Sequence, residues 1–299
     1  MTVKGQLAAL DWGTSSLRAA LLDANGAVLD ERSLGRGILS VAPGEFPTVF
    51  EAACGDWLRA GTPHAIVSGM AGSRQGWMEA PYCACPAGFA EIAAQLAWIE
   101  PGRIGIVPGL SCEEGGVPDV MRGEETQVLG ALDLLGSDDA LFVLPGTHSK
   151  WARVTQGRIE SFSTFMTGEF YALLRKHSIL ARTLPETDGE LDEHAFRRGV
   201  DRSLRGTGLL HNAFGVRTLS LFDRLAADAL PSYLSGLVIG EELRAQELPA
   251  ESVPVVVIGA PALTRRYEIA LQALGASVQS LGSEATWRGL WRMAEVAPW

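Results

Sequence analysis

The chain has 299 residues, enough for one large domain or two of medium size, and a chain of this length buries about 75% of its unfolded surface. Hydrophobic residues make up 47% and charged residues 20%, an ordinary globular composition that excludes wholesale disorder and fibrous repeats. The net charge of -10 argues against nucleic acid or an anionic membrane surface as a partner. An anionic ligand would need a small, local cationic site.

The sequence predicts neither a membrane span nor export. Its longest apolar run, 253–263, is broken by Gly259 and Pro261 and is shorter than the ~18 residues of a span. The N-terminus lacks the apolar core of a signal peptide, so we expect a cytoplasmic location. Cys83 and Cys85 could form a metal or redox pair, but no second Cys/His pair at ligand spacing accompanies them, and we expect all four cysteines to be reduced.

The first part of the chain predicts three meandering strands followed by alternating helices and strands. Apolar runs separated by turn residues predict strands at 7–11, 17–22 and 27–32. Apolar residues at helical spacing predict helices at 46–57 and 89–99, and short apolar runs predict buried strands at 65–69 and 103–107.

A helix at 128–135 precedes a second unit of the same kind, with strands predicted at 141–144, 150–154 and 158–165. This unit repeats the first in architecture, with little residue identity. The remaining elements predicted are helices at 169–180, 193–204, 231–246, 264–274 and 284–295, and strands at 254–259 and 277–281. Ser283 is the expected N-cap of the last helix.

Two predicted hairpin turns carry small hydroxyl residues that suit phosphate. In the first, Asp11 ends a strand and is followed by Gly13, Thr14, Ser15, Ser16 and Arg18, which offer N–H, O–H and guanidinium donors, while Asp11 could hold a hydrated Mg²⁺. The second, Gly146 to Lys150, has the same ingredients with Thr147 and a lysine. Either turn could instead be an ordinary polar hairpin. A hydrolase pairing of His148 with Ser149 is disfavoured, because neighbours on a strand point to opposite faces.

Two glutamates follow Gly123 at the start of a predicted helix. Acidic residues in a first helical turn are favoured by the helix dipole, which is a sufficient structural reason for Glu124 and Glu125. A carboxylate projecting from a helix N-terminus is also a suitable general base for a substrate hydroxyl. The residues alone leave both interpretations open.

Two loops after predicted buried strands could also bind ligands. Arg74, Gln75 and Trp77 offer a polar fork, an amide and a flat face that suit a polyol or sugar acid, although a surface loop with one packed Trp is the alternative. Gly259, Ala260 and Leu263 lie where a strand ends before a helix, a usual place for adenosine in an α/β fold. Neither a Gly-x-Gly-x-x-Gly nor a P-loop motif occurs.

In this order, the segments resemble the sugar kinase, actin and Hsp70 type of ATPase. The resemblance implies an α/β, two-domain actin-like ATPase (ribonuclease H-like) fold with a cleft between the domains. It implies an N-terminal domain at 1–120 and a C-terminal domain at 121–299, with the last helix packing back at the hinge. Small residues at Gly130, Ala285 and Gly289 suit a close crossing of the two connecting helices.

Longer phrases resemble the 2-dehydro-3-deoxygalactonokinase family. They are Leu10–Gly13, Met121–Gln127, Pro145–Trp151, Met166–Glu169 and Ser235–Gly240. The resemblance implies ATP-dependent phosphorylation of the 6-hydroxyl of 2-dehydro-3-deoxy-D-galactonate to 2-dehydro-3-deoxy-6-phosphogalactonate, in galactonate catabolism. Related sugar kinases have an Asp as general base in a Gly-Asp-Gln phrase, whereas this chain has Glu124 there, with Glu125 beside it.

The resemblance also implies residue roles. The phosphates of ATP would be held by the first turn with Arg18 and by Gly146, Thr147 and Lys150 of the second. Asp11 would hold Mg²⁺ through water. The adenosine would contact Gly259, Ala260 and Leu263. Glu124 or Glu125 would be the base, with Glu124 preferred. The cations expected for the sugar acid are Arg74, aided by Gln75 and Trp77, then Arg122, Lys176 and His177.

Three alternatives to this assignment remain. The chain could phosphorylate another small sugar acid such as 2-dehydro-3-deoxygluconate, act as a non-sugar actin-like ATPase, or bind a ligand without transfer chemistry. A homodimer is possible if Trp291 and Trp299 form an exposed patch.

Overall fold

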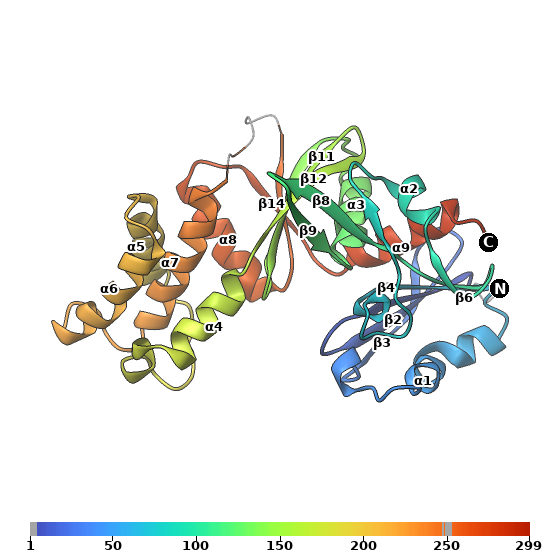
Figure 1. Cartoon of the computed structure of the whole chain (residues 1–299), viewed down its shortest axis with the longest axis horizontal. Helices are drawn as coiled ribbons and strands as arrows, with labels where there is room; N and C mark the ends of the chain where they lie inside the picture. The colour runs from blue at the N-terminus through green and yellow to red at the C-terminus, as the bar shows by residue number, and fades with distance from the viewer. Residues whose placement is uncertain (1–4, 247, 249–252) are drawn as a thin grey trace. The chain divides into compact units, whose positions relative to one another are not determined.

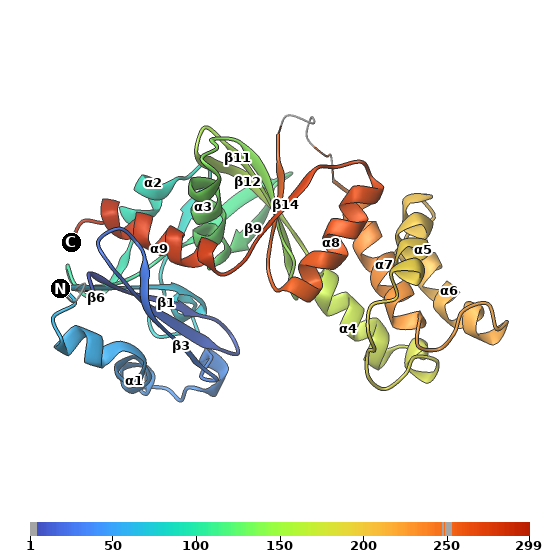
Figure 2. The ribbon, with the colours of Figure 1, turned by 180° about the vertical axis from the view of Figure 1, so that it is seen from behind.

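In the computed structural model of the chain (Figure 1, and from behind in Figure 2), residues 5–246, 248 and 253–299 are described. Contacts between residues divide the chain into two units. The first holds the described residues up to Ala140, with Ala152–Ser163 and Leu281–Trp299; the second holds Leu141–Trp151 and the described part of Thr164–Ser280. The units do not follow a single cut in the chain, and a domain boundary at residue 120 stays a prediction.

The first unit is built on the predicted meander. β1 (Leu7–Trp12) pairs antiparallel with β2 (Leu17–Leu22), and β2 pairs antiparallel with β3 (Val28–Leu34). β4 (His64–Gly69) lies parallel to β1 on its other side. β7 (Ile104–Ile106) and β6 (Ala97–Glu100) complete the sheet order β3-β2-β1-β4-β7-β6. β1 and β4 are almost wholly buried, as their apolar runs predict.

A smaller sheet and several helices complete this unit. β8 (Gly109–Glu114) pairs parallel with β5 (Tyr82–Ala84) and antiparallel with β9 (Val117–Met121). The helices are α1 (Phe46–Arg59), α2 (Phe89–Ala93), α3 (Glu124–Leu135) and α9 (Glu284–Val296), with 3-10 turns η1 (Ile38–Ser40) and η2 (Met70–Gly72).

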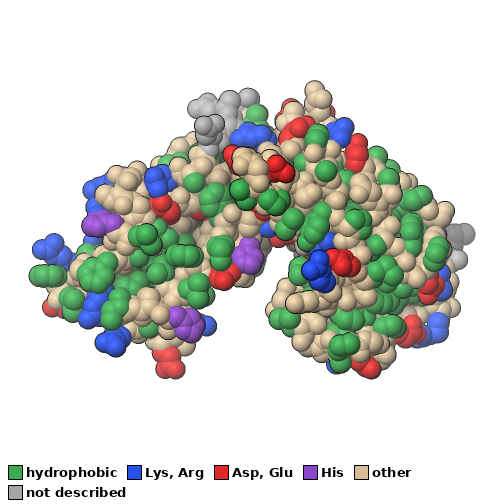
Figure 3. Space-filling model, viewed as in Figure 1, with side chains coloured by type: hydrophobic (Ala, Val, Ile, Leu, Met, Phe, Trp, Pro, Cys, Tyr) green, Lys and Arg blue, Asp and Glu red, His purple; other side chains and the backbone are tan. Residues whose placement is uncertain are grey.

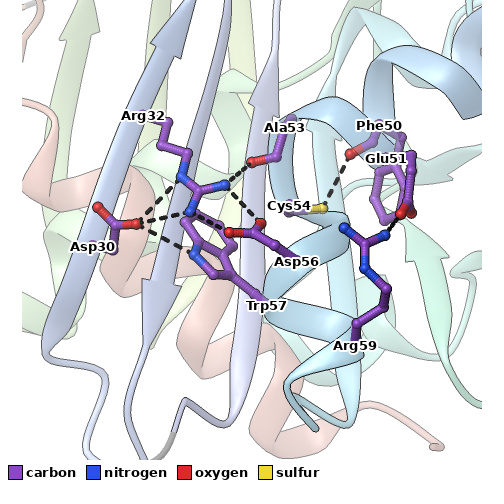
Figure 4. A network of polar contacts seen from close by, with 9 residues as sticks. All are labelled: Asp30, Arg32, Phe50, Glu51, Ala53, Cys54, Asp56, Trp57 and Arg59. Carbon is purple, nitrogen blue, oxygen red and sulfur yellow. Dashed lines mark hydrogen bonds and ion pairs between the residues drawn. The ribbon is translucent and has the colours of Figure 1, made fainter.

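An arginine attaches α1 to the meander (Figure 4). Arg32 on β3 donates to both carboxylate oxygens of Asp56 on α1, at 2.7 and 2.8 Å, and to the carbonyl of Ala53. Its guanidinium also lies over the ring of Trp57, 4.2 Å from the centroid. The hydrogen bond from Arg32 lowers the pKa of Asp56, so the pair is held as two charges at neutral pH.

Two glycines allow α3 and α9 to cross closely. A Cβ at Gly130 on α3 would lie 2.0 Å from the carbonyl oxygen of Ala285, and one at Gly289 on α9 would lie 2.0 Å from that of Thr126. No larger residue fits these positions without moving a backbone. The close crossing expected from the small residues is therefore present within the first unit.

A second sheet has five strands, of which β10 and β13 lie largely in the second unit, whereas most of β12 is grouped with the first. Its order is β12-β11-β10-β13-β14, so the second meander occurs as predicted. The strands are β10 (Ala140–Leu144), β11 (Ser149–Thr155), β12 (Arg158–Phe165), β13 (Val255–Ile258) and β14 (Val278–Leu281). β13 lies parallel to β10, as β4 does to β1.

Helices form the rest of the second unit around a buried one, α7. They are α4 (Thr167–His177), η3 (Ile179–Arg182), α5 (Glu193–Leu204), α6 (Leu209–Leu221), α7 (Leu230–Arg244) and α8 (Pro261–Ala273). α7 is buried on almost every side. It crosses α5 closely, because a Cβ at Gly236 would lie 2.1 Å from the carbonyl oxygen of Phe196.

Several sequence predictions about elements are wrong. The helix predicted at 89–99 ends at Ala93, because the next apolar residues pair in β6 with β7. The helix predicted at 169–180 begins at Thr167 and gives way to η3 after His177. Helix α6 and the sheet β5-β8-β9 were not predicted. Ser283 precedes α9, but its side chain makes no capping hydrogen bond there.

Candidate active site

The first hydroxyl-lined turn connects β1 and β2 in the first unit. The N–H of Gly13 donates to the carbonyl of Ser16 at 2.9 Å and closes the hairpin. The following chain braces the turn from one side, because the N–H of Ile38 donates to the carbonyl of Gly13 at 3.0 Å. Thr14, Ser15 and Ser16 are exposed, and within the described residues their hydroxyls have no hydrogen-bond partner. The turn is thus held in place while its hydroxyls stay available to a ligand.

Asp11 lies at the end of β1, beside this turn. Arg18, its cross-strand neighbour in β2, donates to its Oδ2 at 2.6 Å, and the Asp11 side chain is 18% exposed. The Arg18 guanidinium also lies 5.5 Å from the ring centroid of Trp287. Arg18, predicted to contact phosphate, is therefore held against Asp11.

Two glycines bring the ends of β1 and β4 close to the start of α3. Gly69 and Gly123 have φ values of +91° and +105°, a region that side chains rarely adopt. A Cβ at Gly69 would lie 3.4 Å from Asp11 Oδ1, and one at Gly123 would lie 3.2 Å from the Cα of Gly69. Asp11 and the glutamates after Gly123 thus belong to one region of the first unit.

Glu124 and Glu125 both fold back onto the start of α3. Glu124 accepts a hydrogen bond from the N–H of Arg122 at 3.0 Å, and Glu125 accepts one from the N–H of Gly123 at 2.7 Å. Glu125 is fully buried and also accepts from Thr126, whose hydroxyl lies 3.0 Å from that of Ser68. Burial, then the charge of Glu124, raises the pKa of Glu125 to about 7. Glu124 is partly exposed, so of the two it has the access that a base needs.

Arg122 is buried just before this helix. Its Nη2 donates to the carbonyl of Ala80 at 2.8 Å, and its guanidinium lies 4.5 Å from the ring centroid of Tyr82. Its Nε and Nη1 are buried, and no described residue accepts a hydrogen bond from them. A Cβ at Gly72, in the loop after β4, would lie 2.8 Å from Nη1. Two nitrogens of this guanidinium therefore have no hydrogen-bond acceptor among the described residues.

The other residues predicted for the sugar acid belong to separate parts of the fold. The Arg74 side chain is 87% exposed and lies 3.5 Å from Glu79, and Gln75 is exposed. Trp77 packs into the core of the first unit, 5.0 Å from Phe50 and 6.1 Å from Trp12 between ring centroids. Lys176 and His177 belong to the second unit, in the last turn of α4.

The second hydroxyl-lined turn lies in the second unit, between β10 and β11. The start of α4 rests on it: the N–H of Glu169 donates to the carbonyl of Thr147 at 3.0 Å, and a Cβ at Gly168 would lie 2.4 Å from the carbonyl oxygen of Gly146. Lys150 is buried, and its ammonium donates to the hydroxyl of Thr164 at 2.6 Å.

A pocket of about 340 Å³ in this unit joins the turn to α8. Gly146, Thr147 and Leu263, predicted separately, line it together. Gly259 and Ala260 precede α8, and a Cβ at Gly259 would lie 3.7 Å from the ring of Pro145, directly before the turn. The other lining residues are Thr167, Gly168, Tyr171, Asp188, Ser235, Val238, Ile239, Arg266 and Tyr267.

Glu242 on α7 was not predicted and lies directly behind this pocket. Its carboxylate accepts hydrogen bonds from Ser149 at 2.8 Å, Trp151 at 2.5 Å, Tyr267 at 2.7 Å and Thr167. Burial raises the pKa of Glu242, and the four donors oppose that rise. Thr167 and Tyr267 are pocket residues, so Glu242 fixes part of the wall. One sequence signal existed, because Glu242 follows the pocket residues Ser235 and Val238 at helical spacing.

Arg266 is a second residue that the sequence analysis missed. It lines the same pocket, three residues after Leu263 on α8, and no described residue forms an ion pair or hydrogen bond with it. The pocket carboxylate, Asp188, is already held by Arg175 at 2.7 Å and by the hydroxyl of Tyr171 at 2.8 Å. Arg266 is thus a cation available to an anionic ligand.

The cysteines are free, as predicted. Burial raises the pKa of Cys83, and that of Cys85 to about 12, so neither is a ready thiolate.

The described residues contain no group of three or more His, Cys, Asp or Glu placed to hold a metal. Across the same residues, no helix has the length and apolar character needed to span a membrane.

The paired meanders and their two turns are typical of the actin-like ATPases and sugar kinases, and solved structures agree. An activator of 2-hydroxyisocaproyl-CoA dehydratase from Clostridium difficile with bound ADPNP, 11% identical, matches this fold with a TM-score of 0.52 over 97% of this chain and 95% of its own. The predicted fold class is therefore confirmed.

The chain belongs to the 2-keto-3-deoxy-galactonokinase family, whose model matches residues 11–293. It is 38% identical to a protein named probable 2-dehydro-3-deoxygalactonokinase from Rhizobium meliloti, over 100% of this chain and 99% of that one. It is 34% identical to 2-dehydro-3-deoxygalactonokinase of Escherichia coli, over 94% of each. A crystal structure of such a protein from Sinorhizobium meliloti, 38% identical, covers 98% of this chain and 100% of its own with a TM-score of 0.88.

Proposed function

We propose that this protein transfers the γ-phosphoryl group of ATP to the 6-hydroxyl of 2-dehydro-3-deoxy-D-galactonate, giving 2-dehydro-3-deoxy-6-phosphogalactonate in galactonate catabolism. The observation that carries the proposal is the pocket of the second unit, because it combines a Gly-Thr turn, a helix start and the residues after a buried strand. Family membership indicates which acceptor to expect.

ATP binding is assigned to the two turns and the pocket. Gly259, Ala260 and Leu263 contact the adenosine, and Gly146 and Thr147 contact the phosphates, with Arg266 adding charge. We also assign the exposed hydroxyls of Thr14 to Ser16, in the first unit, to phosphate binding. Arg18 and Lys150 shape the turns, since each already has a partner. Phosphoryl transfer requires mainly such positioning and charge neutralisation.

Asp11 suits a magnesium ion held through water. Mg²⁺ in kinases is typically bound by one or two carboxylates plus substrate phosphates, so the partly exposed carboxylate of Asp11 beside the first turn fits the ion. The ion, when bound, neutralises charge on the phosphates. The pairing with Arg18 orients the Asp11 carboxylate.

Glu124 is the proposed general base. Its partial exposure supports this role over Glu125, which is enclosed and holds the start of α3 through Gly123 and Thr126. Glu124 accepts the proton of the 6-hydroxyl as the oxygen attacks the γ-phosphorus, a contribution of about 10²–10⁴ in rate.

Arg122 is the cation best supported for the sugar carboxylate. A buried guanidinium with unpaired donors is costly, and a bound carboxylate would remove that cost. Arg74 is the second candidate, with Gln75 beside it. Because its side chain is exposed, Arg74 is suited to attracting the sugar acid rather than to holding its carboxylate in one position. Trp77 contributes by packing beneath the loop.

Acceptor-dependent ADP release tests the function. We expect ADP formation only when 2-dehydro-3-deoxy-D-galactonate is added, and weaker activity with 2-dehydro-3-deoxygluconate. In Glu124→Gln, kcat should fall at least about 10²-fold with ATP affinity retained. Acceptor-independent ATP hydrolysis would contradict the proposal, and near-normal turnover in both Glu124→Gln and Glu125→Gln would contradict the base.

Substrate kinetics separate the two arginines. Arg122→Gln should raise the Michaelis constant for the sugar acid more than Arg74→Gln does, with the ATP constant unchanged in both. Equal, wild-type sugar-acid constants in both variants would remove both residues from the substrate site.

The reaction also implies a place in the cell. We assign the protein to the cytoplasm, where ATP is available; fractionation of cells grown on galactonate tests this.

Trp299 stacks on His64 at 4.3 Å between ring centroids, and Trp291 lies within 2.7 Å of where a Gly26 Cβ would be. Both tryptophans thus have partners inside the first unit and give no support to a homodimer patch.

A further inference from the structure

A second polar pocket, of about 380 Å³, lies among α5, α6 and α7 of the second unit. Its lining shares no residue with the pocket proposed for ATP. Arg198, Arg202 and Arg205 contribute from α5 and its end, Thr218 from α6 and Tyr233 from α7. Figure 3 shows several separate Lys and Arg side chains among hydrophobic ones at the end of the unit that holds α5 and α6.

The three arginines lie on one face of α5 because they are spaced by four and three residues. At 1.5 Å per residue, they span about 10 Å along the helix. None forms an ion pair or hydrogen bond with another described residue. By contrast, Arg175 and Arg265 of the same unit are paired with Asp188 and Glu193.

The charges of the lining are unbalanced. Asp201 is the lone carboxylate among the described residues that line the pocket, against three guanidinium groups. The dipole of α5 favours cations in its last turn, which accounts for Arg202 and Arg205. It does not account for Arg198, which lies a turn earlier and adds repulsion at four-residue spacing. In a chain of net charge -10, such a cluster indicates an anionic ligand.

The rest of the lining suits an oxygen-rich ligand. The hydroxyl of Tyr233 adds a neutral donor, whereas that of Thr218 already donates to the carbonyl of Gly215 at 3.2 Å. Guanidinium groups bind phosphate oxygens in a bidentate manner. Their spread along the helix suits two anionic groups better than one.

We propose that this pocket binds a small phosphorylated metabolite with two anionic groups, at a site separate from the ATP pocket. Arg198 and Arg202 hold one group, and Arg205 holds the second. The site goes beyond the proposed kinase reaction and does not depend on it, because every lining residue belongs to the second unit alone.

Calorimetric titration with inorganic pyrophosphate tests the site, with the ATP pocket saturated by a non-hydrolysable ATP analogue at fixed free Mg²⁺. We expect one binding event in the wild type, weakened at least about 10-fold in Arg198→Gln/Arg202→Gln and also in Arg205→Gln, because each loses charge-assisted hydrogen bonds. Inorganic phosphate should bind more weakly than pyrophosphate. Arg197→Gln is the matched control, since Arg197 is exposed on the same helix and lies outside the pocket lining.

Three results would overturn the proposal. They are no binding of pyrophosphate by the wild type at millimolar concentration, wild-type affinity in both pocket variants, and equal weakening in the Arg197→Gln control. Arg205→Gln keeps the test valid if the double variant unfolds, because residue 205 follows α5 and is exposed.

Discussion

Two buried carboxylates show how single residues set the chemistry of this protein. Glu125 accepts hydrogen bonds from Gly123 and Thr126 and has a second carboxylate beside it, and its pKa is raised to about 7. Glu242 is enclosed by four donors, which oppose the rise in its pKa that burial causes. The first is a carboxyl whose protonation changes near neutral pH, and the second is a fixed anchor of a pocket wall.

The raised pKa of Glu125 predicts a pH-dependent stability. The carboxyl loses its proton near pH 4.5 when unfolded but near 7 when folded, so stability is full below about pH 4.5 and falls as pH rises toward 7. This group alone removes on the order of 3 kcal/mol across that range. Urea unfolding at pH 5 and 7.5 should therefore show a smaller loss for Glu125→Gln than for the wild type. Parallel losses in the two proteins would refute the assignment.

Glu242 should act on nucleotide binding through Thr167 and Tyr267. In Glu242→Gln, an amide replaces one acceptor, so we expect a loss of roughly 1–3 kcal/mol in stability and weaker ATP binding. The sugar-acid Michaelis constant should stay unchanged. Its neighbour Glu241, which pairs with Arg244 near the surface, supplies the matched control Glu241→Gln. Unchanged ATP affinity in Glu242→Gln would assign the residue to folding alone.

Sequence reasoning found the residues that stand in local patterns and missed those placed by packing. Gly146, Thr147 and Leu263 were predicted from turns and strand ends, and one pocket unites them. Glu242 and Arg266 are interior helix positions, so their roles depend on which helix faces which strand. The burial of Arg122 and the exposure of Arg74 depend on the path of the loop after β4, which no local pattern determines.

At the scale of elements, backbone contact between helices is the main constraint. The α3–α9 crossing places the carbonyl of Thr126 against Gly289, so Gly289→Ala brings a Cβ within 2.0 Å of an oxygen. We expect this substitution to cost about 1–3 kcal/mol by overpacking. Gly215→Ala on α6 is the control, because its Cβ has room and the change should be neutral or stabilising by about 0.4–1 kcal/mol. Chemical denaturation of both variants measures the difference; similar stabilities would show that the helices separate easily.

The elements that were predicted are those with a clear hydrophobic period. β1, β2, β12 and α5 occur at or within a residue of their predicted bounds. α6 exposes large apolar residues such as Leu210 and Phe214, so its sequence lacks the contrast between faces that identifies a helix. The strands β8 and β9 are partly polar, and they exist because they pair with each other and with β5.

At the scale of the whole chain, two sheets repeat one plan. Each has three meandering strands and then a strand parallel to the first, and each places a hydroxyl-bearing turn after its first strand. This plan was predicted because turns and apolar runs are local. The division into contact units, with Ala152–Ser163 and Leu281–Trp299 joined to the first, depends on long-range packing and was not.

The central claim is that the chain phosphorylates the 6-hydroxyl of a sugar acid with ATP. Proton-coupled ³¹P NMR of a mixture of protein, Mg²⁺, ATP and 2-dehydro-3-deoxy-D-galactonate tests it directly. We predict ADP together with a phosphomonoester signal split by the two C6 protons. ADP with inorganic phosphate alone, or a phosphomonoester coupled to a single proton, would contradict the claim.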